Sequence, residues 1–217
     1  MQYRKKMMTA VALTLIVTLI VSVSTESLRD YLYFTWQVQE GEHFIFEVSV
    51  DGYSETGNVL FPVAQAVLNN TRLMVEIVSL PMDSIIIDGK IYAEYIIEYL
   101  KTNLSFENGT AIPLNLIFEM NNLVSRCFVP RGPWNLLDSF YPDNFVQPIN
   151  ATAESYISHF QGNSFYIGYV SYSVNRGTGW NCVCSMSTGV PSTMKTWAWS
   201  YGGLHEYSYN VTLNLVG

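Results

Sequence analysis

Three aromatic residues near the C-terminus, Trp197, Trp199 and Tyr201, follow one another at a spacing of two residues. Residues at this spacing point to the same face of a β-strand, so the pattern predicts a flat stripe of aromatic rings. Such a stripe can stack against sugar rings or against a protein surface. The spacing also fits aromatic side chains that lie under a loop or a crossing helix. These three residues form the candidate ligand-binding site.

A β-hairpin is predicted to hold the stripe. The chain turns at Gly202-Gly203, and a two-residue loop there would place Trp199 opposite Glu206. The stripe then shares its face with polar side chains. The opposite face is the predicted core face, and it carries Met194, Ala198, Tyr207, Tyr209, Val211, Leu213 and Leu215.

The three cysteines could form one disulfide. Cys182 and Cys184 are two residues apart in a predicted strand, which places their Cα atoms about 6.5–7 Å apart, a poor distance for bridging each other. Either of them could pair with Cys127 in an oxidising compartment, and the third would stay free or bridge between chains. The alternative is that all three are buried free thiols. Without an adjacent His they make an incomplete zinc site, so no metal is expected.

Catalytic motifs are not recognisable in the sequence. His43, His159 and His205 are far apart, and there is no nucleophile elbow, P-loop or dinucleotide-binding fingerprint. Glu94 and Glu98 fit a solvated edge better than a catalytic pair. We therefore expect no enzymatic activity and no cofactor. A hydrolase is the less favoured alternative, since it would need two carboxylates, or a nucleophile and a base, converging in a cleft.

The N-terminus has the layout of a targeting segment. Basic residues at positions 4–6 precede an uncharged, mostly apolar run over 7–23, and Ser22 and Ser24 suit the −3 and −1 positions of a cleavage site. A cleaved signal peptide and an uncleaved membrane anchor both fit, and the positive-inside rule gives the same orientation for either. We therefore assign 1–24 to this segment and expect the rest of the chain outside the cell, secreted or at its surface.

Glycosylation acceptors and net charge agree with export. Five Asn-x-Ser/Thr sequences occur, although some arise by chance in a chain rich in these residues. They are Asn69, Asn103, Asn108, Asn150 and Asn210. The formal net charge is −7, which repels phosphate backbones, so nucleic acid is not an expected partner. Contact with the membrane is expected only through residues 7–23, if they are not removed.

Residues 25–217 are predicted to form a single β-rich domain. Apolar residues alternate with polar ones over 44–50, 73–78, 166–174 and 180–186, which is the period of a half-buried strand. Tight-turn sequences recur between such segments: Asp51-Gly52, Asp88-Gly89, Asn108-Gly109, Gly162-Asn163, Gly177-Thr178-Gly179, Thr188-Gly189 and Gly202-Gly203. The expected fold is mainly β, an antiparallel meander curling toward a sandwich or a half-open barrel. One N-terminal hydrophobic helix and a few short helices accompany it.

The short helices are expected at 133–141 and within 59–68, where a proline intervenes. Segments 91–100 and 152–160 fit either a helix or a strand.

The run WQVQEGEHFIFEV over 36–48 resembles the opening of exported β-rich archaeal proteins of uncharacterised function. Residues 133–137 and the hairpin around Thr188-Gly189-Val190 are similar to later features of those proteins. The sequence departs from them at Glu42, where Asp is usual. The resemblance implies an exported β fold and carries no activity or functional residues.

The sequence thus favours a non-enzymatic, exported cell-surface or secreted binding module, whose partner is an unknown protein or carbohydrate. The alternative is a carrier or sensor that holds an apolar ligand in a half-open barrel.

Overall fold

The computed structural model describes residues 34–81, 86–87, 90–91, 100–139 and 153–216. The N-terminal targeting segment, the Asn150 acceptor and most of the ambiguous segment 91–100 lie outside these residues. Within them, no helix is both long and apolar enough to cross a membrane.

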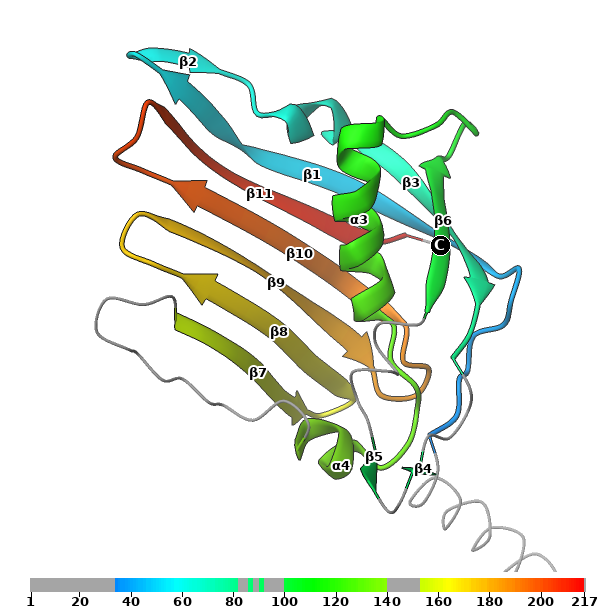
Figure 1. The fold of residues 1–217 in the computed structure, drawn as a ribbon. Coiled ribbons are helices and arrows are strands. Elements are labelled where there is room, and N and C mark those ends of the chain that lie inside the picture. Colours follow the sequence, from blue (N-terminus) through cyan, green and yellow to red (C-terminus); the bar gives the residue numbers. More distant parts are fainter. Residues whose placement is uncertain (1–33, 82–85, 88–89, 92–99, 140–152, 217) are drawn as a thin grey trace, which may run out of the picture.

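The described chain folds mainly as one nine-stranded antiparallel sheet, which confirms the mainly β prediction (Figure 1). Along the sheet the order is β6-β3-β1-β11-β10-β9-β8-β7, and β2 pairs with β1 beside this path. The strands are β1 (His43–Thr56), β2 (Val59–Phe61), β3 (Thr71–Ser79), β6 (Lys101–Phe106), β7 (Ala153–Gln161), β8 (Ser164–Tyr172), β9 (Arg176–Ser185), β10 (Pro191–Ser200) and β11 (His205–Leu215). A separate pair is formed by β4 (Ile86–Ile87) and β5 (Lys90–Ile91).

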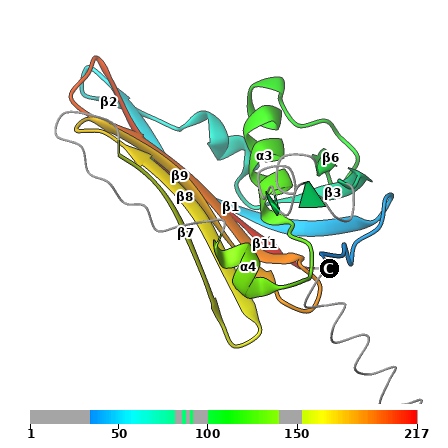
Figure 2. The same cartoon turned by 60° about the horizontal axis from the view of Figure 1, so that its bottom comes forward.

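Strands β7 to β11 form the predicted meander, and β1 then pairs with β11 to join the two halves of the sheet. The sheet stays open, with β6 and β7 at its edges. A helix, rather than a second sheet, covers one of its faces. Figure 2, which views the sheet more nearly edge-on, shows this helix on one side.

The covering helix is α3 (Leu114–Cys127), which the sequence analysis did not predict. It begins directly after Pro113, and its buried residues recur at a spacing of three or four, the period of an α-helix: Leu116, Met120, Leu123, Val124 and Cys127. A second helix, α4 (Trp134–Ser139), confirms the helical turns expected at 133–141. A 3₁₀ helix, η1 (Ala64–Leu68), falls within the expected segment 59–68.

Both α-helices lie on the same face of the sheet, which we call the covered face. The Tyr209 hydroxyl donates a hydrogen bond to Glu119 on α3 (2.7 Å), and the Ser158 hydroxyl bonds to Asp138 on α4 (2.6 Å). Alternate strand residues on this face are buried, among them Phe46, Val48, Leu73, Val75, Met194, Val211 and Leu213. The residues between them point to the other side, which we call the open face.

Two predicted turns lie inside strands instead. Asp51-Gly52 is within β1, and Gly177-Thr178-Gly179 is within β9. At Gly52 a Cβ would lie 2.3 Å from the Ser208 carbonyl oxygen, so this glycine permits close strand approach. The turns at Asn108-Gly109, Gly162-Asn163 and Thr188-Gly189 are observed, and the segment 152–160 is in strand β7.

The predicted register of the last hairpin was wrong by two residues. Trp199 lies opposite Ser208, because the loop is wider than Gly202-Gly203 alone. The Gly202 amide donates to the carboxylate of Glu206, the second residue of β11 (2.8 Å), which ties the loop to that strand. Since the offset is even, every side chain keeps its predicted face.

Candidate functional site

The aromatic stripe lies on the open face, where the sequence placed it. Trp197 and Trp199 are half-buried, and Tyr201 is 43% exposed. The rings of Trp199 and Tyr201 stack with centroids 5.3 Å apart and an interplanar angle of 24°. Because α3 and α4 pack on the covered face, neither helix crosses the stripe.

Two glycines of β9 explain why each indole is half-buried although it lies on the open face. Gly179 lies opposite Trp197, and Gly177 lies opposite Trp199. A Cβ at Gly179 would come 2.3 Å from Trp197 Cζ2, and one at Gly177 would come 2.6 Å from Trp199 Cε2. The indoles therefore lie flat on the β9 backbone. Their inner surfaces are packed and their outer surfaces remain accessible to a ligand.

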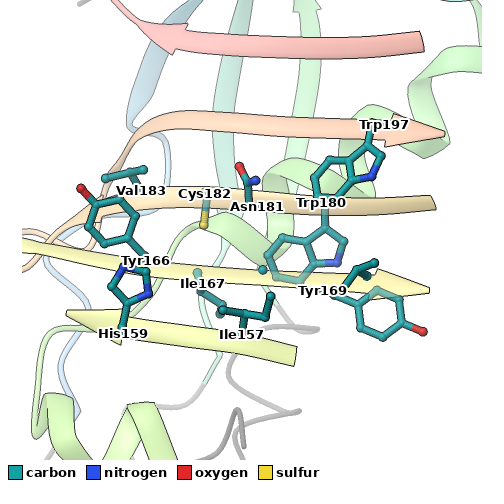
Figure 3. A pocket seen from close by; sticks show the side chains of 12 residues that line it. Ile157, His159, Tyr166, Ile167, Tyr169, Trp180, Asn181, Cys182, Val183 and Trp197 are labelled. Atoms are coloured by element: carbon teal, nitrogen blue, oxygen red, sulfur yellow. The ribbon is translucent and has the colours of Figure 1, made fainter. Parts of the chain in front are cut away.

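A hollow of about 470 Å³ adjoins the stripe on strands β7 to β10 (Figure 3). Its floor includes Gly168 of β8, which supplies backbone only. Side chains on the open face wall it: Ile157, His159, Tyr166, Val170, Asn181, Val183 and Trp197. Ile167, Trp180 and Cys182 alternate with these residues and are buried, so they contribute mainly backbone. Trp197 thus belongs to both the stripe and the hollow.

The end of the hollow farthest from Trp197 along the strands is formed by His159 and Tyr166. They face each other across β7 and β8, and their rings stack in parallel, with centroids 4.6 Å apart and an interplanar angle of 3°. This stack and the Trp197 indole form two aromatic walls. Between them, the exposed Asn181 amide offers both hydrogen-bond donors and an acceptor.

The hollow has no formally charged acidic or basic side chain among the described residues of its lining: none is Asp, Glu, Lys or Arg. On the β11 side of the stripe the neighbours are polar: Asn210 lies opposite Trp197, and Ser208 lies opposite Trp199. The Tyr53 side chain extends the aromatic surface to β1. Partial desolvation and the neighbouring Tyr201 raise the pKa of its phenol. The lining of the hollow thus suits an uncharged group of a ligand, and Lys195 lies beside it on the same face, opposite Asn181.

Sequence reasoning found the stripe but missed the hollow. His159, Tyr166, Gly168 and Asn181 come from three strands, and their meeting depends on the β7–β8–β9 registers. The alternation around Tyr166 and Val170 was visible in the sequence. What it could not show was that Gly168 would lie opposite Asn181, and Val170 opposite the Gly179 on which Trp197 packs.

The three histidines lie on three different strands. His205 Nδ1 is 2.9 Å from Thr56 Oγ1, His159 stacks on Tyr166, and His43 begins β1. Throughout the described ranges, no group of three or more His, Cys, Asp or Glu side chains could hold a metal ion.

The three cysteines gather on the covered face as free, buried thiols. Cys184 Sγ donates to the Cys127 carbonyl oxygen at 2.9 Å, and Cys182 Sγ lies 3.6 Å from Cys184 Sγ. Burial raises the pKa of each thiol, so all three are protonated and poorly reactive near neutral pH. A disulfide from Cys127 to Cys182 or Cys184 stays a prediction.

The described glycosylation acceptors occupy different surroundings. Asn69, Asn103 and Asn108 are exposed, and each makes a side-chain hydrogen bond: to Val50, Glu76 and Thr110 respectively. Asn210 is half-buried in the middle of β11, directly opposite Trp197. A glycan at Asn210 would therefore stand beside the stripe, whereas the other three acceptors are remote from it. Their use stays a prediction.

Searches against protein-family models, curated proteins and solved structures found no match to this chain. Fold and site together define an open antiparallel sheet with helices on one face and an aromatic surface on the other.

Proposed function

We propose that this protein is a non-enzymatic, exported binding module that holds its ligand on the open face of the sheet. The observation that carries this proposal is the pair of indoles laid on Gly177 and Gly179, next to a preformed hollow. Flat aromatic surfaces held rigidly before binding lose little entropy when a ligand arrives. The basic and apolar N-terminal segment supports a location outside the cell.

The ligand we favour is a glycan. Sugar rings combine an apolar face, which suits an indole or phenol ring, with hydroxyl groups that need hydrogen-bond partners at the edge. The site offers both kinds of contact: the rings of Trp197 and Trp199, and the side chains of Asn181 and Ser208. The lack of charge in the hollow favours a neutral ligand over a phosphorylated or sulfated one.

The carrier alternative has one observation in its favour, the largely apolar wall of the hollow. However, the sheet is open, so an acyl chain or similar ligand would lie on a surface rather than inside a half-open barrel. Such a ligand would contact Ile157 and Val170 more than the stripe.

Titration with neutral oligosaccharides of glucose and of N-acetylglucosamine tests the proposal, with tryptophan fluorescence and calorimetry as readouts. We expect the triple variant Trp197→Ser, Trp199→Ser, Tyr201→Ser to weaken binding by about 100-fold or more, because aromatic anchors dominate such contacts. The matched control is Phe61→Ser with Phe118→Ser, since both side chains are exposed elsewhere. Unchanged binding in the triple variant would exclude this site.

A second substitution separates the stripe from the hollow. Ile157→Trp adds bulk to the hollow wall and leaves the stripe intact. It should block a ligand that enters the hollow and spare one that uses only Trp199 and Tyr201. Binding of a fatty acid, but of none of the sugars, would favour the carrier alternative.

A further inference from the structure

Three turns meet at one end of the sheet. They are the β1–β2 turn at Gly57-Asn58, the β10–β11 loop at 201–204 and the β8–β9 turn at 173–175. The strand registers place them together, because Thr56 lies opposite His205 and Ser200 lies opposite Arg176. Figure 1 shows all three at the end of the sheet opposite to the start of β1.

Each turn presents a large apolar side chain to solvent. Val174 is 91% exposed, Leu204 is 88% exposed, and Leu60, just after the first turn, is 66% exposed. Val59 and Phe61 flank Leu60 and are also exposed. We call Leu60, Val174 and Leu204 the apolar tip. Exposed aliphatic side chains cost free energy in water, and here three separate loops share the feature.

Hydrogen bonds hold the three turns in place. The Tyr201 amide donates to the Asn175 carbonyl oxygen at 2.9 Å, which joins the second and third turns. Thr56 Oγ1 and His205 Nδ1 are 2.9 Å apart, which joins the first turn to β11. The apolar tip is therefore presented by an ordered frame, so little conformational entropy is lost when it is buried.

The shape of the apolar tip favours a deformable partner. Successive turns are two strands apart in the sheet order, which corresponds to about 10 Å from one to the next. The tip is thus a row of separate points about 20 Å long and not a continuous patch. A flat protein surface would leave gaps between such points, whereas the interfacial region of a lipid bilayer closes around each one.

The charges around the turns indicate the headgroup charge of the bilayer that the tip would contact. Glu55, Arg176 and Glu206 sum to a charge of −1, no lysine lies in the three turns, and the whole chain has a net charge of −7. Attraction to anionic headgroups would require a cluster of basic residues. We propose that the apolar tip inserts into the interfacial region of a zwitterionic lipid bilayer, as a membrane contact separate from the N-terminal segment.

An environment-sensitive dye on Leu204→Cys in the full chain tests this proposal with phosphatidylcholine vesicles. The native thiols are buried, so labelling is selective for the new cysteine. We expect the dye emission to rise and shift to the blue on vesicle addition. Val174→Ser and Leu60→Ser should each raise the lipid concentration needed by about tenfold. The signal reports on the tip itself, whatever residues 7–23 do.

The matched control is the same dye on Leu114→Cys, which is 81% exposed at the start of α3. Its emission should not change. An equal response at both positions would indicate general adsorption and would overturn the proposal. So would vesicle-bound protein whose Leu204 dye stays in water, an absence of binding, or binding that requires anionic lipid.

Discussion

The two faces of strands β10 and β11 are built from neighbouring residues, yet they solve the same packing problem differently. On the covered face, Met194 and Leu213 are fully buried because α3 supplies the other side of the core. On the open face, Trp197 and Trp199 gain their burial from the strand next to them, by lying on glycines. The covered face is therefore closed to ligands, whereas the open face keeps one side of each indole available.

The largest expected difference between the faces comes from two adjacent residues of β11. Leu213→Ala removes a fully buried side chain from the covered face and should lower the free energy of unfolding by about 3 kcal/mol. Thr212→Ala, on the open face, should change it by less than about 0.5 kcal/mol. Urea denaturation of both variants measures the difference. Equal losses would mean that the open face is also a packed core.

The next largest effect is expected at the glycines on which the indoles pack. Gly177→Ala should cost about 1–3 kcal/mol, because its Cβ would overlap the Trp199 indole. The nearest atoms to that Cβ all belong to Trp199, so the same substitution in a Trp199→Ala background should cost much less. Denaturation of the two single variants and the double variant completes the cycle. If the free-energy losses of the two single variants add up to that of the double variant, the Trp199 indole does not pack on Gly177.

A smaller effect is expected where α3 is tied to the sheet. Tyr209→Phe removes the hydrogen bond to Glu119 and should cost about 1 kcal/mol at neutral pH. Burial and the Glu119 bond raise the pKa of Tyr209, so the folded protein keeps this phenol neutral at pH values where the unfolded chain ionises it. The phenol of Tyr209 therefore makes its full contribution to the free energy of unfolding below about pH 10, and this contribution is lost as the pH rises further.

Thermal unfolding across pH 8 to 11 measures that dependence. The wild type should lose stability above about pH 10 more steeply than Tyr209→Phe does, since only the wild type carries this phenol. Parallel curves for the two proteins would contradict the burial of the hydroxyl against Glu119.

The sequence predicted the strands and the two faces of the last hairpin because both depend on local alternation. The register was missed because the loop between β10 and β11 is longer than the Gly202-Gly203 pair that signals the turn. An even error is harmless for the faces, so the stripe was still placed correctly.

Helix α3 could have been found. Leu116, Met120 and Leu123 follow a helical period after Pro113, and the search for strands passed over them. Glycine was the other source of error. In Gly177-Thr178-Gly179 it signals a place where an aromatic ring will lie, not a turn, and that meaning appears only once β10 is beside β9. The hollow needed three such strand pairings at once, which no local pattern encodes.

The pairing of β1 with β11 has a consequence for how the protein is made. One edge of β1 pairs with β2 and β3, which follow it closely along the chain, but its other edge pairs only with the last strand, with Phe46 opposite Leu215. Contacts between such distant residues form slowly, because a long loop must close first. A chain emerging N-terminus first therefore cannot complete its sheet until Leu215 has been made. If the protein is exported as proposed, this delay is an advantage, since an unfinished sheet can still be threaded through a membrane pore.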